Sequence, residues 1–251
     1  MLLAALESPK SPLDRYRHHL SLLVRDTADM GSRQNAGETL GGRVAALNEV
    51  ILGRYEYAGD QDQYDDLANA NLMRVIDRRR GLPVALGILY LHAARGQGWA
   101  SYGLNFPGHF LLRLDLDGER AILDPFNGGA RLEPADLRAR LKSVAGEAAE
   151  LEPAYTAPVS HRDVALRLQN NIKLRLIRAD RPGEALNIVE SMLMIAPDRE
   201  ALWLEAGVMH THLDNLRAAL LSLGNFLDLS RDDDARREVS DLVRQLKAKL
   251  N

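Results

Sequence analysis

Residues 84–94 read VALGILYLHAA and are apolar on every side. A helix of this kind has no face to turn toward water, so it must be buried inside the protein. Pro83, directly before it, suits the first position of a helix, where its missing N–H costs nothing. Gly96 and Gly98 then end the helix. The sequence therefore predicts a buried central helix around which the other elements must be built.

A β-hairpin is predicted after this helix. Residues 109–116 alternate in polarity, and Asp117-Gly118 is a strong two-residue turn between this strand and a second strand at 120–124. The turn pairs Asp115 with Arg120, a favourable charge pair, and residue 111 with Asp124. Asp124 then lies on the face of His109, one diagonal step away and within side-chain reach. A three-residue loop would flip Asp124 to the other face.

The rest of the chain is predicted to be mostly helical. Apolar residues at helical spacing over 11–80 indicate an N-terminal helical subdomain, interrupted by a polar loop at 31–37. After the hairpin comes a proline-containing linker with a short helix at 134–141. Beyond Pro158 the chain reads as helical to its end, so we expect the domain boundary there.

The C-terminal part carries an internal repeat of 34 residues. The shift superposes Gln169 on Trp203, Ile172 on Ala206, Lys173 on Gly207, Ala185 on Ala219, Val189 on Leu223 and Met192 on Phe226. These positions, with Pro197 closing the first unit, resemble the tetratricopeptide pattern. Two units and a polar helix at 233–250 that can cap them predict a small helical stack. A plain helical bundle is the alternative.

Composition and charge exclude several classes of function. The chain is 46% hydrophobic and 27% charged, as in ordinary globular proteins, and its net charge of −3 is evenly spread. A general nucleic-acid binder needs a concentrated basic surface, so none is expected. No apolar run approaches the roughly 18 to 20 residues of a membrane span, and no secretory signal is expected at the N-terminus. We therefore expect a cytoplasmic protein.

Three short runs resemble one known family. RRGLP at 79–83, NFPGHF at 105–110 and LDPFNGG at 123–129 are similar to the SirB-type branch of the transglutaminase-like superfamily. The resemblance implies an α+β, mostly helical protein. A transglutaminase-like domain, with a helix and a small antiparallel sheet, would span residues 1–157, and an all-α stack of tetratricopeptide type would span 158–251.

The same resemblance implies a catalytic site without its nucleophile. In catalytic relatives a cysteine stands at the N-terminus of the buried helix, and a histidine and an aspartate on adjacent strands activate and orient it. Here the cysteine position is Pro83, the other two are His109 and Asp124, and the chain contains no cysteine. His109 and Asp124 then have three alternative roles: a structural hydrogen bond, a ligand pocket shaped also by Asn105 and Asn127, or residual hydrolytic chemistry.

No metal site or cofactor is expected. His210 and His212 face different directions on a helix, His92 reads as a core residue, and His18 and His19 read as surface residues. One histidine and one aspartate fall short of the three protein ligands that a catalytic zinc usually has.

The leading functional hypothesis is a non-catalytic module that binds a protein or peptide through its helical repeats. The alternative is a hydrolase or acyl transferase in which His109 is the general base, Asp124 orients it and water is the nucleophile.

Overall fold

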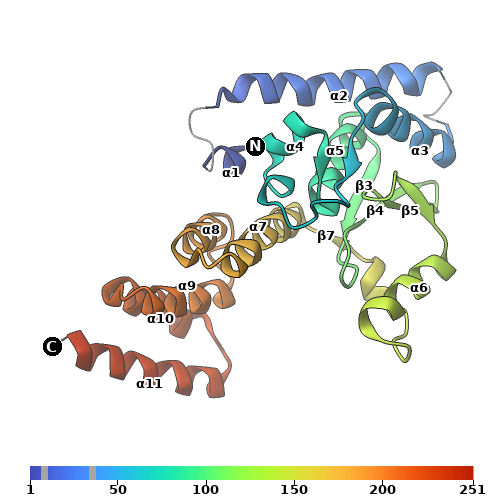
Figure 1. The fold of residues 1–251 in the computed structure, drawn as a ribbon. Helices are drawn as coiled ribbons and strands as arrows, with labels where there is room; N and C mark the ends of the chain where they lie inside the picture. The colour runs from blue at the N-terminus through green and yellow to red at the C-terminus, as the bar shows by residue number, and fades with distance from the viewer. Residues whose placement is uncertain (7–10, 34–37, 251) are drawn as a thin grey trace. The chain divides into compact units, whose positions relative to one another are not determined.

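The structure is a computed structural model that describes residues 1–6, 11–33 and 38–250. It divides into two compact units, Met1–Leu168 and Gln169–Asn251 (Figure 1). This division falls inside helix α7 (His161–Arg178), later than the 157/158 boundary that the sequence suggested. The reason is that Pro158–Val159 form strand β7 in the sheet of the first unit. That residues 1–157 and 158–251 fold separately stays a prediction.

The first unit begins with the expected helical subdomain. It contains α1 (Leu2–Leu6), α2 (Leu13–Arg33), α3 (Leu40–Asn48), a π-helix (Glu49–Arg54), a short 3-10 helix (Leu67–Asn69) and α4 (Leu72–Arg78). The prediction of a loop over 31–37 was wrong at its start, because α2 continues through Arg33. Ser32 is accommodated in the helix since its hydroxyl donates to the carbonyl of Ala28. Residues 34–37 lie outside the described residues.

The predicted buried helix is α5 (Pro83–Gly96), with Pro83 in its first turn. Arg79, at the end of α4, has a left-handed backbone with φ 59°. The chain then passes through β2 (Arg80–Gly81), which pairs in parallel with β1 (Ala58–Gly59). α5 packs on α2 and on the sheet. At Gly87 the helix lies so close to the Phe110 ring that an added Cβ would overlap it.

The sheet has five antiparallel strands in the order β6-β5-β4-β3-β7. These strands are β3 (Ala100–Leu104), β4 (Leu111–Leu116), β5 (Glu119–Asp124), β6 (Ala130–Leu132) and β7. The hairpin register is confirmed, with Asp115 opposite Arg120 and Leu112 opposite Leu123. Asp117 and Gly118 both have positive φ, as a two-residue hairpin turn of type I′ requires. Asp115 nevertheless forms its ion pair with Arg113, at 2.9 Å.

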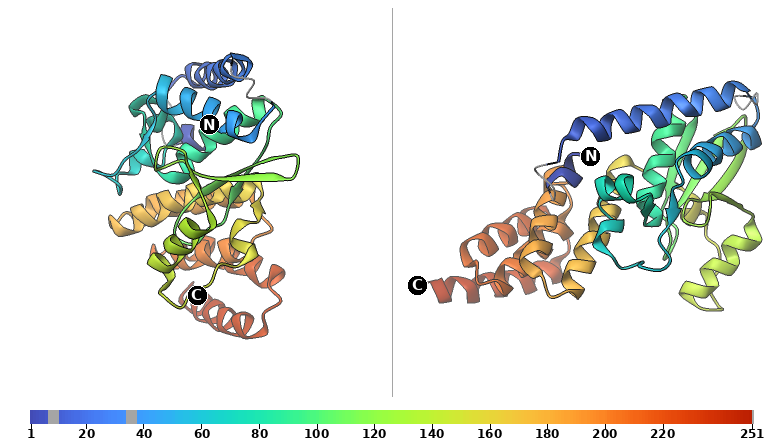
Figure 2. Two further views of the ribbon diagram at one scale, coloured as in Figure 1. Left: turned by 90° about the vertical axis from the view of Figure 1, so that its right-hand side faces the viewer. Right: turned by 45° about the horizontal axis from the view of Figure 1, so that its top comes forward.

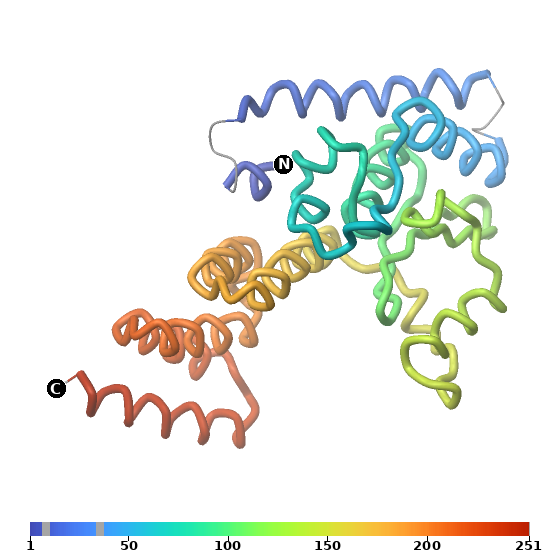
Figure 3. The backbone as a smooth tube through the Cα atoms, viewed as in Figure 1, coloured from blue at the N-terminus to red at the C-terminus, as the bar shows by residue number. Residues whose placement is uncertain are grey.

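Helices cover both faces of this sheet. Leu112, Leu114 and Leu123 meet Tyr90, Leu91 and Ala94 of α5 around a small interior space. On the other face, Leu137 and Leu141 of α6 (Pro134–Ala145) pack with Leu104, Phe106 and Leu111. Figure 3 shows the chain leaving β6, forming α6 and returning as β7. The predicted helix at 134–141 is therefore confirmed, and it extends to Ala145.

The second unit is all helical. It contains the end of α7, α8 (Pro182–Ile195), α9 (Glu200–His212), α10 (Leu216–Leu229) and α11 (Asp233–Leu250), the last with the predicted bounds (Figure 2). Ala185 and Ala219, which the repeat makes equivalent, are both fully buried, and Gly207 closely contacts Leu223 of α10. The repeat and the α+β class are thus confirmed. Among the described residues, no helix has the length and apolar character to cross a membrane.

Candidate functional site

His109 and Asp124 form a hydrogen-bonded pair in the first unit. His109 lies in the turn before β4, Asp124 ends β5, and His109 Nε2 is 2.8 Å from Asp124 Oδ1. The Asp124 side chain is fully buried, whereas the His109 side chain is 12% exposed. The predicted closeness of these two residues is therefore confirmed, and it follows from the two-residue turn that fixes the register.

Several donors hold the Asp124 carboxylate in place. Oδ1 also accepts from the backbone N–H groups of Phe126 (3.0 Å) and Asn127 (3.3 Å). Oδ2 accepts from Asn127 Nδ2 and from Arg140 Nη2 of α6, each at 2.7 Å. Burial alone raises the pKa of Asp124, but the hydrogen bonds from His109 and Asn127 and the charges of His109 and Arg140 outweigh it and lower the pKa. Asp124 is thus a fixed carboxylate.

This carboxylate determines the tautomer of His109. An ionised carboxylate only accepts hydrogen bonds, so the His109 nitrogen that faces it, Nε2, carries a proton. The Phe126 ring meets the imidazole edge to face, with centroids 6.2 Å apart. The arrangement is that of a histidine oriented by a carboxylate, in which Nδ1 is the ring nitrogen that does not face Asp124.

Arg167 of α7 fixes the loop that carries His109. Its guanidinium donates to Asn105 Oδ1 at 2.9 Å and to the backbone carbonyls of His109 at 2.8 Å and Phe106 at 3.3 Å. It also lies over the Phe110 ring, 5.7 Å from the centroid. Asn105, which the sequence suggested as a ligand-binding residue, therefore accepts a hydrogen bond from Arg167 that holds the loop before β4.

Asn127 and the glycines after it form the turn that supports Asp124. Asn127 donates to Asp124 twice, and Gly129 has φ +61°. The Gly129 carbonyl accepts from Asn48 Nδ2 at 3.2 Å, and Asn48 Oδ1 accepts from the Tyr90 hydroxyl at 3.0 Å. Burial first, and then the charge of Asp124, raise the pKa of Tyr90. The sequence suggested Asn127 as a residue that shapes a ligand pocket, and these contacts give it a structural part in the turn.

Pro83 is buried at the start of α5. The Phe126 ring that touches His109 also packs against Gly59, which pairs with Gly81 just before Pro83. Phe126 thus contacts both the imidazole and β1, the strand that pairs with β2 directly before α5. The assignment of Pro83 to the nucleophile position stays a prediction.

Arg140 and Arg167 were missed by sequence reasoning. Both come from helices distant along the chain, and arginine spacing alone does not distinguish them from surface arginines.

Two histidine predictions were wrong. His19 is buried because α2 packs it against Tyr57, with Nε2 2.7 Å from the Tyr57 hydroxyl and 2.9 Å from Arg79 Nη1. His92 is on the exposed side of α5 and has one bond, to the carbonyl of Leu20. In the described part of the chain, no group of three or more histidine, aspartate or glutamate side chains is placed to hold a metal ion.

The fold and the site define the class of the protein. Residues 14–170 match the transglutaminase-like superfamily, and residues 172–244 match the tetratricopeptide repeat. The chain therefore belongs to the transglutaminase-like superfamily and combines such a domain with tetratricopeptide repeats.

Relatives that cover most of the chain place it in the SirB-type family, as the three sequence runs suggested. A UPF0162 protein of Xylella fastidiosa is 31% identical over 190 residues, which is 74% of this chain and 68% of that protein. A UPF0162 protein of Pseudomonas aeruginosa is 30% identical over 226 residues, or 88% and 79%. F-box only protein 21 of Mus musculus is 37% identical over 82 residues, which cover 33% of this chain and 13% of that protein.

Proposed function

We propose that the protein is a non-catalytic binding module, in which a transglutaminase-like domain without a nucleophile is joined to repeats that bind a protein or peptide. The observation that carries this proposal is the absence of cysteine from the whole chain, with Pro83 at the start of α5. Proline has no group that can attack a carbonyl or accept a proton. The histidine that Asp124 orients therefore has no thiol to activate anywhere in this chain.

The repeats supply a candidate binding surface. Leu174 of α7 and Val208 of α9 are 34 residues apart, so they occupy the same repeat position, and both are exposed. Ile177 adds a third exposed apolar side chain on α7. Lys173 Nζ and Glu205 Oε1, 2.6 Å apart, tie the two helices together beside these residues. Recurrent apolar exposure at one repeat position supports binding of a polypeptide segment.

One observation favours the rival function, a hydrolase or acyl transferase with a water nucleophile. The His109–Asp124 pair has the geometry of a general base and its orienting group, although no side chain takes the place of the nucleophile. We place the binding function first because the pair is also explained as the support of the turns around β4 and β5. The charge and hydropathy of the chain support a cytoplasmic protein without nucleic-acid or membrane partners.

The proposal is tested with the full chain in two parallel assays. Peptide and amide substrates are expected to show no hydrolysis or acyl transfer, and turnover lost in His109→Ala but kept in His161→Ala would overturn the non-catalytic assignment. In crosslinking with cell extract, protein bands captured by the wild type are expected to disappear in the Leu174→Asp/Val208→Asp variant. They are expected to persist in Leu221→Asp, which alters an even more exposed leucine of α10. Bands that respond alike to both variants would contradict a binding surface on α7 and α9.

A further inference from the structure

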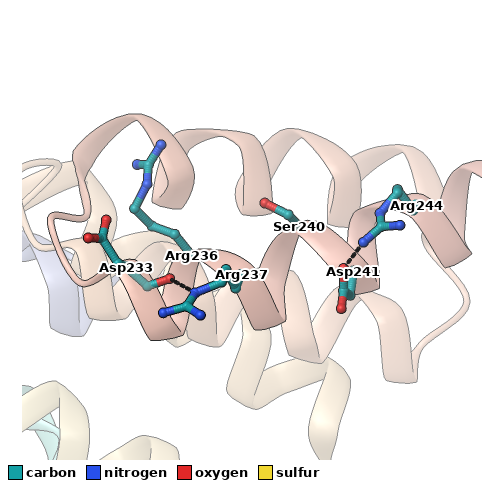
Figure 4. A pocket seen from close by; sticks show the side chains of 6 residues that line it. All are labelled: Asp233, Arg236, Arg237, Ser240, Asp241 and Arg244. Atoms are coloured by element: carbon teal, nitrogen blue, oxygen red, sulfur yellow. Dashed lines mark hydrogen bonds and ion pairs between the residues drawn. The ribbon is translucent and has the colours of Figure 1, made fainter.

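The outer face of α11 carries a stripe of alternating charge. Asp233, Arg237, Asp241 and Arg244 follow one another at intervals of four, four and three residues, so they lie on one side of the helix. Together with Arg236 and Ser240 they line a hollow of about 630 Å³ (Figure 4). Arg236 is engaged elsewhere, since it donates to the carbonyls of Leu227 and Ser230 at the end of α10.

The repeat explains why this face is open. In α9, Trp203 packs in the core with α10, and Gly207 lets Leu223 of α10 approach closely. The positions 34 residues later on α11 are Arg237 and Asp241. Their side chains are 77% and 59% exposed. The side of α11 that corresponds to a helix-packing face is therefore charged and uncovered in the described residues.

The order of charges on this face is self-complementary. Along α11 it reads negative, positive, negative, positive, so a second α11 running in the opposite direction presents the matching sequence of opposite charges. Arg237 then faces Asp241 of the second copy, and Asp233 faces Arg244, each pair occurring twice across a two-fold axis. Ser240, a small residue near that axis, lets the helices come close. We propose that α11 is a homodimerisation surface in which two copies pair antiparallel through these four residues.

The geometry also sets the strength of this association. Arg237 now bonds Asp234, at 2.5 Å, and Arg244 bonds Asp241, but these pairs are exposed and can exchange for pairs between molecules. Exposed ion pairs are individually weak, and the contact would involve one face of a single 18-residue helix, which is about 27 Å long. The dimer is therefore weak, concentration-dependent and salt-sensitive. This inference does not rest on the binding function proposed above.

Sedimentation equilibrium of the full chain measures the dimer directly. The wild type is expected to dimerise reversibly at low salt. The dissociation constant should rise at least about tenfold between 0.1 M and 1 M salt, because the screening length falls from about 10 Å to about 3 Å. A chain that stays monomeric up to millimolar concentration at 0.1 M salt would overturn the proposal. That result would also be found if α11 served only as a polar cap or bound another protein.

Charge exchange tests the register of the pairing. Arg237→Glu and Asp241→Arg each place like charges opposite one another at both copies of the central pair. Each is expected to weaken the dimer at least about tenfold. The double variant R237E/D241R restores opposite charges and should recover the dimer. An equimolar mixture of the two single variants should recover it as a heterodimer.

A matched control separates this effect from a change in net charge. Arg217→Glu alters an exposed arginine of α10 and is expected to leave the dissociation constant unchanged. Circular dichroism of each variant checks that the helices are retained. A dimer that persists in both single variants would show that another surface is used. A dimer that is lost in the single variants and recovered by neither the double variant nor the mixture would likewise contradict the proposal.

Discussion

At the scale of single residues, the buried polar groups are held by specific partners. Asp124 has five hydrogen-bond donors around its two oxygens, and His19 accepts bonds from Tyr57 and Arg79 at one ring nitrogen. An unpaired buried charge is strongly destabilising, so such groups persist only with their partners. The two differ in their response to acid, because Asp124 is stable as an anion and His19 is stable as a neutral ring.

His19 is expected to make the fold sensitive to mild acid. Burial, and then the charge of Arg79, lower the pKa of His19 from 6.5 to about 4. Between these two pKa values the unfolded chain binds a proton at His19, whereas the folded chain does not. The free energy of unfolding therefore falls as the pH falls from 6.5 to 4. The loss is at most roughly 3 kcal/mol.

Urea unfolding at a series of pH values measures this loss. His19→Gln keeps an acceptor for Tyr57 and Arg79 but does not titrate, so its stability should fall less over the same range. His18→Gln, at the exposed neighbouring position, should behave as the wild type does. A wild-type profile that is flat between pH 6.5 and 4 would show that the imidazole is protonated inside the fold.

At the scale of elements, α5 packs closely against the residue before β4 at a single glycine. Gly87 lets the Phe110 ring lie directly on the helix backbone, and Phe110 follows His109 in the chain. A larger residue on this face of α5 would push the ring away and disturb the strand that begins at Leu111. The packing of the helix and the position of the site are therefore coupled at this contact.

Gly87→Ala is expected to lower the free energy of unfolding by about 1–3 kcal/mol, since the new methyl group overlaps the Phe110 ring. The helical position otherwise favours alanine. Gly224→Ala in α10, where a Cβ meets open space, should accordingly raise stability by about 0.5–1 kcal/mol. Chemical denaturation of both variants provides the comparison. A neutral or stabilising Gly87→Ala would mean that Phe110 can move aside at little cost.

The elements that could be predicted from the sequence are those whose own residues mark where they start, turn or end. Pro83 and the apolar residues after it define α5, and Asp117-Gly118 fixes the register that brings His109 to Asp124. β6 and β7 were not predicted, because strands of three and two residues are too short to show alternation. Arg140 and Arg167 could not be predicted either, since only the tertiary fold brings their helices to the site.

At the scale of the whole molecule, the chain consists of two units that each have their own core. Leu104, Phe106 and Leu111 belong to a cluster in the first unit, whereas Leu223 and Phe226 belong to a cluster in the second. The repeat pattern identified the second unit from sequence. The bounds 1–157 and 158–251 stay a prediction, and α7 runs through the division between the two units without a break in its helical pattern.

Because each unit has its own core, we expect a destabilising substitution in the repeats to affect the second unit and not the first. Gly207→Ala forces a methyl group against Leu223 and should loosen α9 and α10. Hydrogen exchange should then show lost protection in these helices and unchanged protection in α5 and β4. Gly183→Ala, at a position with open space in the same unit, is the matched control. Loss of protection spreading equally through α5 would indicate that the chain unfolds as one cooperative body.

The bond from His109 to Asp124 also limits how the imidazole can contact another molecule. Because Nε2–H donates to the carboxylate, its proton is not available to a second acceptor. A molecule that contacts this ring must therefore do so through Nδ1 or through the ring carbons.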